Sequence, residues 1–486
     1  MQLQHRLREY AGFFRSDPAD AIGLLALLVL AASAPFPLGG VQPGGPVRIQ
    51  LLSFLAAAAA AVRRRRSPSP PPPVSFASVI LLTVALLGVV QLLPLPVGLL
   101  EAISPASARV YSGATEVLSA SGATIPVARI SIAPVETRNV ALLSASYAAA
   151  LLAAFTLLAS RNRRRLFAGV LLASMALQAV HAVATEQEAG RISGPFVNPD
   201  HFAGYLGMGL ALAFGGLVVA FSPRRHQRGP VHFGSVERRI ASGAVGVLLW
   251  ALFASALALT HSRGGMLAAA ATTLFLAALA LGGRLGPDAS SLARRRLVLA
   301  GGLGLAVLFA AAALGSRPLL RFLATDPRDL GSDTRVLLWA HALEAWKSYP
   351  ILGSGLGTFR EAFRAVQPAD LSGLVETAHG DFLQLLVTGG LVGSLLGAAA
   401  WVVLALFLLR GALLHIRREE GAFALAGLGA LVAIALHGLV DFNLSLPAPA
   451  ATLALVSGAA AAACRDAETR AGRGPARSGI ETTAIP

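Results

Sequence analysis

The chain alternates between long apolar stretches and shorter segments of polar and charged residues. Each apolar stretch is close to the roughly 20 residues that an α-helix needs to cross the ~30 Å hydrocarbon core of a bilayer. The pattern therefore predicts an all-α polytopic membrane protein with about 12 transmembrane helices. The predicted spans are 20–38, 47–62, 74–94, 138–160, 165–185, 201–221, 240–260, 264–283, 297–315, 382–409, 421–440 and 446–463.

The composition supports a membrane protein. Hydrophobic residues make up 55% of the chain and charged residues only 13%, which is outside the range of soluble domains. A formal net charge of +15 would favour a nucleic-acid partner in a soluble protein, but the position of the charges gives another interpretation here. The single cysteine, Cys464, excludes both a disulfide framework and a cysteine metal site.

Arginine clusters indicate which ends of the helices face the cytoplasm. If the N-terminus is cytoplasmic, the clusters fall on alternate loops and hold most of the 40 lysine and arginine residues. Cytoplasmic loops of membrane proteins carry such an excess, so we expect both termini to be cytoplasmic. The clusters lie within 6–15, 63–66, 161–165, 224–239, 284–296, 410–418 and the tail from 465 onward.

The predicted spans and loops divide the chain into five parts. These are helices 1–5 (1–190), helices 6–9 (191–315), a long outer loop between helices 9 and 10 (316–381), helices 10–12 (382–463) and a cytoplasmic tail (464–486). A second long outer loop covers 95–137. Segment 63–73, four arginines followed by a Ser/Pro run, predicts a stiff linker rather than a folded element.

The outer loop 316–381 contains a helical pattern. Ser332 is a suitable N-cap, and the pattern ends before Pro350. We expect an amphipathic helix along the membrane surface, followed by a tight turn at the glycines of segment 353–357. Its apolar positions are Val336, Leu337, Trp339, Ala340, Leu343 and Trp346.

Arg263 interrupts the apolar pattern between two predicted helices on the outer side. A cation at such a depth is costly unless an anion or a polar group meets it. The next helix begins directly after Arg263, so free backbone N–H groups and the positive end of the helix dipole lie nearby. The position predicts a phosphate site, in preference to a snorkelling arginine, because topology-setting arginines belong on the other face.

Two further outer-side residues are candidates for chemistry. Arg335 lies in the first turn of the loop helix, where the helix dipole disfavours a cation, although a solvated face would also explain it. His379 lies where span 382–409 enters the membrane. An imidazole with an ordinary pKa near 6.5 can accept a proton from a hydroxyl at neutral pH, and Asp381 could orient or tune it. A structural histidine is the alternative.

Two more polar patches lie at outer helix ends. Asn198, Asp200 and His201 open span 201–221, where helix capping explains the two short side chains as well as ligand binding does. His437 and Asp441 flank the outer end of span 421–440. Ionisable groups near the end of an apolar span point to a functional site by default, with a structural role as the alternative.

At these residues the sequence resembles the O-antigen ligase and polymerase superfamily, the bacterial lipid-linked polysaccharide ligases and polymerases. In order and spacing the resemblance covers roughly residues 190 to 450, whereas the first 190 residues match only in hydropathy. The stretches that carry it are 194–204 with Asn198 and His201, 262–265 with Ser262 and Arg263, Arg335 with Trp339, 353–359, His379 with Leu383 and Gly389–Gly390, and 437–442 with His437 and Asp441.

The resemblance implies a GT-C-like architecture of twelve helices with a large periplasmic loop. It also implies metal-free transfer of a glycan from undecaprenyl pyrophosphate to an acceptor hydroxyl, at the periplasmic side of the bacterial inner membrane and without a cofactor. Arg263 and Arg335 would bind the pyrophosphate, and His379 would activate the acceptor. Residues implied at the substrate are Asn198, His201, Ser262, Trp339, Asp381, His437 and Asp441. Related sequences often carry asparagine at position 381, which leaves the basicity of His379 open.

The chemistry of the residues agrees with that assignment. Breaking the bond between an anomeric carbon and a diphosphate creates negative charge, which preorganised arginines stabilise better in a water-poor cleft than in bulk water. Membrane glycosyltransferases that use a metal hold it with clustered acids, and the sequence contains no DxD motif. Arginine catalysis without a metal is the simpler hypothesis.

Two groups of alternatives remain. Within the superfamily, a repeat polymerase or a protein O-oligosaccharyltransferase would share the donor and the arginines and differ only in the acceptor, which is a glycan, a lipid or a protein. A flippase or transporter would show charged residues inside several spans, inverted repeats and broken midplane helices. Charges in this chain lie almost wholly at span ends, and no repeat is visible.

Overall fold

The computed structural model describes residues 17–66, 73–123, 127–186, 190–221, 233–284, 334–369, 371, 373–416 and 418–472. Nine helices in this part of the chain are long and apolar enough to cross a membrane. They are α3 (Gly44–Arg66), α7 (Pro134–Leu157), α8 (Arg161–Thr185), α9 (Pro199–Phe221), α10 (Phe233–Leu259), α11 (Arg263–Arg284), α16 (Asp381–His415), α17 (Glu419–His437) and α18 (Pro447–Gly472). The protein is therefore an integral membrane protein made of helices.

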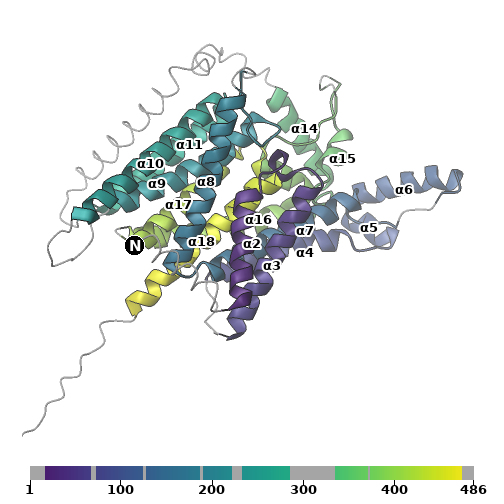
Figure 1. The fold of residues 1–486 in the computed structure, drawn as a ribbon. Helices are drawn as coiled ribbons and strands as arrows, with labels where there is room; N and C mark the ends of the chain where they lie inside the picture. The colour runs from purple at the N-terminus through teal and green to yellow at the C-terminus, as the bar shows by residue number, and fades with distance from the viewer. Residues whose placement is uncertain are drawn as a thin grey trace, which may run out of the picture.

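Two further apolar helices, α2 (Pro18–Ser33) and α4 (Pro73–Gln91), also belong to the bundle (Figure 1). Every predicted span except 297–315 overlaps one of these eleven helices, and 297–315 lies outside the described residues. The total of twelve spans stays a prediction. The predicted linker is wrong at both ends, because α3 continues through Arg66 and α4 begins at Pro73.

The most enclosed helices are α9, α17 and α18, which pack against one another in the middle of the bundle. Their facing surfaces consist largely of alanine and glycine, which allow helices in lipid to approach closely. Gly215 of α9, for example, lies so close to α17 that an added Cβ would come within 2.8 Å of Ala426 Cβ. Small side chains thus allow α9 and α17 to pack closely against each other.

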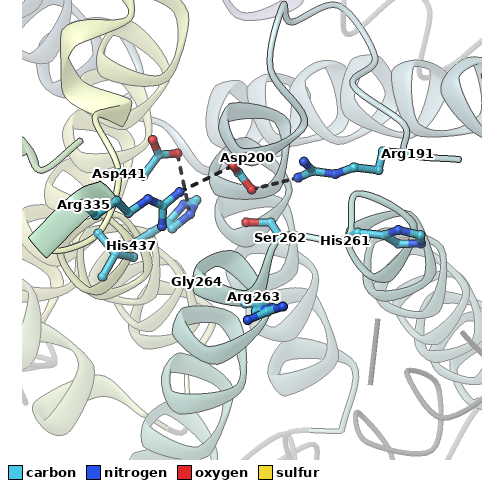
Figure 2. A pocket seen from close by; sticks show the side chains of 10 residues that line it. Arg191, Asp200, His261, Ser262, Arg263, Gly264, Arg335, His437 and Asp441 are labelled. Atoms are coloured by element: carbon cyan, nitrogen blue, oxygen red, sulfur yellow. Dashed lines mark hydrogen bonds and ion pairs between the residues drawn. The ribbon is translucent and has the colours of Figure 1, made fainter. Parts of the chain in front are cut away.

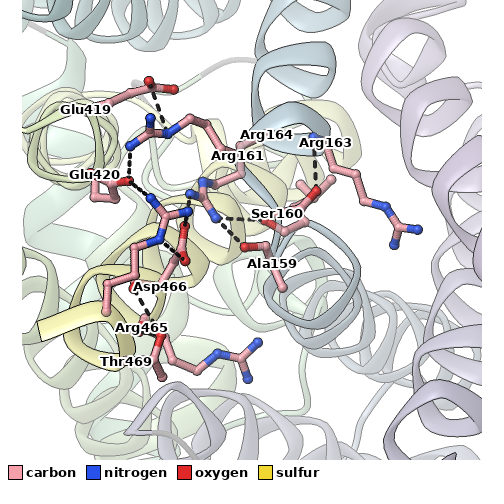
Figure 3. Close-up of polar contacts among 12 residues, drawn as sticks. Ala159, Ser160, Arg161, Arg163, Arg164, Glu419, Glu420, Arg465, Asp466 and Thr469 are labelled. Carbon is pink, nitrogen blue, oxygen red and sulfur yellow. Dashed lines mark hydrogen bonds and ion pairs between the residues drawn. The ribbon is translucent and has the colours of Figure 1, made fainter. Parts of the chain in front are cut away.

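Ion pairs tie the opposite ends of α17 and α18 to α8 (Figure 3). Arg164, only 1% exposed, donates to Asp466 of α18 at 2.6 Å and to the backbone oxygen of Ala159, also at 2.6 Å. Arg161 pairs with Glu420 of α17 at 2.7 Å. The arginines that set the predicted cytoplasmic side therefore also join α8, α17 and α18.

The outer loop 95–137 contains two helices that the sequence pattern did not predict. They are α5 (Val97–Ile103) and α6 (Pro105–Ala120), which project away from the bundle (Figure 1). The Tyr111 hydroxyl fixes α6 by donating to the backbone oxygen of Ser131 at 2.8 Å.

The helix predicted in loop 316–381 is confirmed as α14 (Thr334–Ser348), and α15 (Phe359–Arg364) follows it. The predicted apolar face is wrong in part. Leu338, Ala342 and Ala345 are buried, whereas Val336 and Leu343 are 47% and 42% exposed. The buried face packs on the stacked rings of α15 rather than on a flat surface, and this contact selects a different set of positions. No membrane is present, so the surface position of α14 stays a prediction.

Helix α16 is interrupted at Gly390, whose φ of 61° lies in the left-handed region. Segment 350–356, which includes the predicted glycine turn, fills the break. There the N–H of Leu391 donates to the backbone oxygen of Pro350 at 2.9 Å. A broken helix in lipid is stable only where its free backbone groups find such partners.

Gln91 at the end of α4 completes the junction and is fully buried. Its Nε2 donates to the backbone oxygens of Leu352 at 2.6 Å and Thr388 at 3.0 Å. Its Oε1 accepts a hydrogen bond from the N–H of Leu356 at 2.9 Å. One side chain from the N-terminal half therefore holds both the glycine turn and the first half of α16.

We expect Gln91→Leu to lower the free energy of unfolding by about 2 kcal/mol, because the backbone oxygen of Leu352 and the N–H of Leu356 lose their partner, whereas the oxygen of Thr388 keeps the N–H of Gly355. Thermal unfolding of the purified protein in detergent measures this. The matched control is Gln178→Leu in α8, since Gln178 is also a buried glutamine but donates to a side chain, the Ser174 hydroxyl. Equal stability of the Gln91 variant and the wild type would contradict the role of the junction.

Candidate functional site

A cavity of about 350 Å³ lies where the ends of α9, α11, α14 and α17 meet (Figure 2). It is polar and rich in positive charge, although apolar helices surround it. The lining residues are Arg191, Asp200, His261, Ser262, Arg263, Gly264, Arg335, His437, Val440 and Asp441. The structure thus brings together Ser262, Arg263, Arg335, His437 and Asp441, which the sequence predicted separately.

Arg263 is the first residue of α11, as predicted, and its side chain is exposed. Ser262 precedes it as the N-cap, and its hydroxyl accepts a hydrogen bond from the N–H of Gly265 at 3.2 Å. Among the described residues Arg263 has no ion-pair partner. A guanidinium group at a helix N-terminus, in a cavity, is an arrangement that binds phosphate.

Asp200 lies between two arginines on opposite walls of the cavity (Figure 2). Its Oδ1 is 3.1 Å from a nitrogen of Arg191, and its Oδ2 is 3.9 Å from a nitrogen of Arg335. Asp200 is the second residue of α9 and Arg335 the second residue of α14. The carboxylate therefore joins the membrane bundle to the helix of the outer loop.

Asp441 and His437 line the inner wall, and His201 lies next to Asp441 without being part of the lining. The carboxylate oxygens of Asp441 are 3.7 Å from His201 Nε2 and 3.8 Å from His437 Nε2, too far for hydrogen bonds. Burial raises the pKa of Asp441 to about 7, with Asp200 acting in the same direction and Arg335 opposing it.

Asp441, in the lining, and Asn443, outside it, keep buried side-chain oxygens without a partner at normal hydrogen-bond geometry among the described residues. The backbone N–H of Phe442 interacts with the Asp441 carboxylate and opposes the rise of its pKa. Asp441 is 2% exposed and Asn443 is fully buried. Unsatisfied buried groups are costly, so this wall is suited to a hydroxyl-bearing ligand or to ordered water.

His379 lies beside this cavity rather than in its lining. Its ring packs edge-on against Phe442, with centroids 5.0 Å apart, and the His201 ring contacts the same phenyl ring at 4.4 Å. Burial lowers the pKa of His379, the charge of Arg335 lowers it further, and Asp200 partly opposes both. The side chain is therefore a neutral base at pH 7.

Trp339 positions the backbone next to His379. Its indole N–H donates to the backbone oxygen of Ala378 at 3.0 Å. His379 itself has a φ of 46°, a conformation that residues with a side chain adopt only where the surroundings impose it. Trp339 thus contacts the segment that carries the candidate base, rather than the cavity.

Asp381 does not contact His379 as the sequence suggested. Its carboxylate accepts hydrogen bonds from the N–H of Leu444 at 2.9 and 3.1 Å, and its own N–H donates to the backbone oxygen of Gly438. Asn198 likewise accepts from the backbone, from the N–H of Asp200 at 2.9 Å. Both side chains shape the site by fixing the chain around it.

Arg191 and His261 are the polar residues of the cavity that sequence reasoning did not point to, and Asp200 was weighed there as a helix cap or a ligand contact. A signal for Arg191 existed, because it is an isolated arginine on the predicted outer side, directly before the stretch 194–204. Its partner Asp200 lies only nine residues further along the chain, whereas the second contact of Asp200, with Arg335, comes from a distant segment that spacing could not predict.

No group of three or more His, Cys, Asp and Glu side chains in the described part of the chain is arranged to hold a metal ion. The expectation of metal-free chemistry therefore stays a prediction.

A comparison with protein families finds that residues 247–398 match the family model described as O-antigen ligase. The match covers less than half of the chain and is to a family whose members are glycosyltransferase-like enzymes, and the resemblance to the O-antigen ligase and polymerase superfamily is confirmed. The matched region contains Arg263, Arg335 and His379. No curated protein matches the chain.

The inner wall of the cavity leaves no room for a side chain at Gly204 of α9. An added Cβ would lie 2.1 Å from Asn443 Oδ1 and 2.9 Å from His437 Nδ1. We expect Gly204→Ala to destabilise the protein by about 1–3 kcal/mol through overpacking. The control is Gly207→Ala, one turn further along α9, where the added Cβ meets only Ala433 at 3.7 Å. Equal melting temperatures in detergent would contradict the close packing.

Proposed function

We propose that the protein is a glycosyltransferase that moves a glycan from undecaprenyl pyrophosphate to an acceptor hydroxyl, in the synthesis of a surface polysaccharide. The proposal rests on one observation. Arg263 and Arg335 line the same cavity, and His379, a neutral base, lies beside it. The family match supports the same class of reaction.

The geometry supports a division of roles. His379 takes the proton of the acceptor hydroxyl, whose oxygen attacks the anomeric carbon of the donor glycan. The bond between that carbon and the diphosphate breaks, and the electron pair leaves with the diphosphate. Arg263 and Arg335 stabilise this charge from a fixed position in a site of low dielectric. Asp441, His437 and His201 bind sugar hydroxyls at the inner wall.

We further propose that the cavity opens to the periplasm and that the protein lies in the bacterial inner membrane. The cavity and the paired arginines of Figure 3 lie at opposite ends of α17, whose first turn holds Glu420 and whose last residue is His437. The positive-inside rule assigns the arginine-rich end to the cytoplasm.

A flippase is the alternative from another class, and the break in α16 is a feature expected of it. In a transporter such a break presents free backbone groups to the substrate. Here Gln91 and segment 350–356 occupy groups on both sides of the break. Because these backbone groups have partners, the break fits a rigid support for the site better than a transport pathway.

We expect Arg263→Ala, Arg335→Ala and His379→Ala each to abolish glycan transfer, while the protein still accumulates in the membrane. Purified variants are mixed with a polyprenyl-pyrophosphate-linked glycan and an acceptor, and the product is measured. Arg263→Lys should lose most activity too, because an ammonium group cannot form a bidentate contact with phosphate.

The control is Arg360→Ala, an arginine of α15 that pairs with its neighbour Glu361 and does not line the cavity. Full activity in any of the three alanine variants would remove that residue from the mechanism. If labelled lipid crosses the vesicle membrane and no transfer product forms, the protein is a flippase and the transferase hypothesis is wrong.

The acid limb of kcat/KM should have its midpoint below pH 6.5. The reaction needs neutral His379, and burial and Arg335 keep its pKa below the ordinary value, so the base form persists to lower pH. Asp441 titrates near 7, so the profile is also recorded for Asp441→Asn, in which the limb should remain. A midpoint above pH 6.5 in that variant would contradict His379 as the base.

A deletion strain identifies the class of acceptor that receives the glycan. Loss of a polymerase leaves single repeats attached to the cell surface, loss of a ligase leaves none attached, and loss of a protein O-oligosaccharyltransferase leaves proteins unglycosylated. Surface polysaccharide and glycoproteins of a deletion strain therefore separate these three activities of the superfamily.

A further inference from the structure

Arg191 adds a third guanidinium group to the cavity, of which the proposed donor site uses two. Arg191, Arg263 and Arg335 all line the same space, and Asp200 lies between the first and the last (Figure 2). Against these three arginines the described lining sets two carboxylates, Asp200 and Asp441, of which burial keeps Asp441 partly protonated, and the remaining excess of positive charge is costly in a bundle of apolar helices. The excess points to an anionic ligand.

Arg191 is held rigidly in this place. Its Nε donates to the backbone oxygen of Thr260 at 2.9 Å, in the turn that leads into α11. The next residue, Ile192, donates to the backbone oxygen of Leu259 at 3.2 Å. With Nε bonded to Thr260, a terminal nitrogen of the guanidinium group contacts Asp200. Arg191 and Arg263 are thereby anchored on the same turn between α10 and α11.

Asp200 stands in the place of an anion in this cavity. A carboxylate between two guanidinium groups has the charge and the acceptor geometry of a phosphate oxygen. It contacts Arg191 at 3.1 Å and Arg335 at the longer distance of 3.9 Å. The weaker contact is with the arginine that the mechanism assigns to the donor. Arg335 can therefore turn to a phosphate while Asp200 stays with Arg191.

A charge count distinguishes a site of two arginines from a site of three. A diphosphate diester carries one negative charge on each phosphate. Arg263 and Arg335 together with Asp200 would leave the complex negative, whereas the addition of Arg191 makes it neutral. Asp441 does not disturb this count, because its pKa near 7 rises further when an anion binds nearby.

We propose that Arg191 is a third diphosphate-binding residue and that Asp200 is a built-in counter-anion that matches the charge of the cavity to a diphosphate diester. This inference rests on the proposed function. It goes beyond it by selecting the diester of a lipid-linked glycan over more highly charged diphosphates, such as the lipid diphosphate monoester that leaves in the transfer, for which inorganic pyrophosphate serves as the probe.

The test measures equilibrium binding to the full-length protein in detergent. The probes are a short-chain prenyl diphosphate diester of N-acetylglucosamine and inorganic pyrophosphate. We expect Arg191→Gln to weaken diester binding by about 10- to 100-fold, the range for a lost charge-assisted hydrogen bond. Arg191→Gln with Asp200→Asn should restore most of it, because the charge is neutral again. Arg360→Gln is the control for the same change of charge away from the cavity.

Asp200→Asn alone gives a second measurement that does not depend on Arg191. It makes the cavity more positive, so the ratio of pyrophosphate to diester affinity should rise by about tenfold relative to the wild type. Thermal unfolding of each variant shows whether it is folded.

The outcomes separate this inference from the proposed function. Diester binding that Arg263→Ala abolishes but Arg191→Gln leaves unchanged overturns the role of Arg191 and keeps the donor site. A loss in Arg191→Gln without recovery in the double variant, or an unchanged ratio in Asp200→Asn, overturns the charge matching. Absence of diester binding to the wild type itself would count against the proposed function.

Discussion

A charge inside a bundle of apolar helices is stable only next to a partner, and the helices of this protein are joined where such charges meet. At one end of the bundle, buried Arg164 is paired with Asp466 and with a backbone oxygen. At the other end, Asp200 lies between Arg191 and Arg335. In the first set these charges meet partners within the protein, whereas the second, among the described residues, sets three arginines against Asp200 and the partly protonated Asp441. The difference separates a structural network from a binding site.

The same constraint applies to polar groups without full charge. Most buried polar atoms in proteins have partners, and exceptions require an explanation. Asp441 and Asn443 keep acceptor atoms without partners at normal hydrogen-bond geometry in the described part of the chain, on a wall packed as closely as Gly204 allows. These groups are preorganised for a ligand, because the unbound protein has already met the cost of burying them.

Backbone groups follow the rule as well, and this gives the N-terminal half a role in the site. The break at Gly390 frees backbone groups in the middle of α16, and Gln91 of α4 and segment 350–356 pair with groups on both sides of it. That segment lies between α14, which carries Arg335, and His379. Segment 350–356 is thus bonded to α4 and α16, and it holds in place the outer loop that carries Arg335 before the segment and His379 after it.

The sequence by itself determined which segments lie in lipid and which in water, and the chemical type of the candidate groups. Hydropathy located the helices, and isolated arginines and histidines at outer helix ends identified Arg263, Arg335 and His379, because a costly charge in an apolar context has few explanations. Only the tertiary structure decided which groups are partners. Asp381 bonds to the backbone instead of His379, and Asp200 meets Arg191 and Arg335. The contacts of Asp381 with Leu444 and of Asp200 with Arg335 join segments that are far apart in the chain, and hydropathy and spacing contain no information about the distances between such segments.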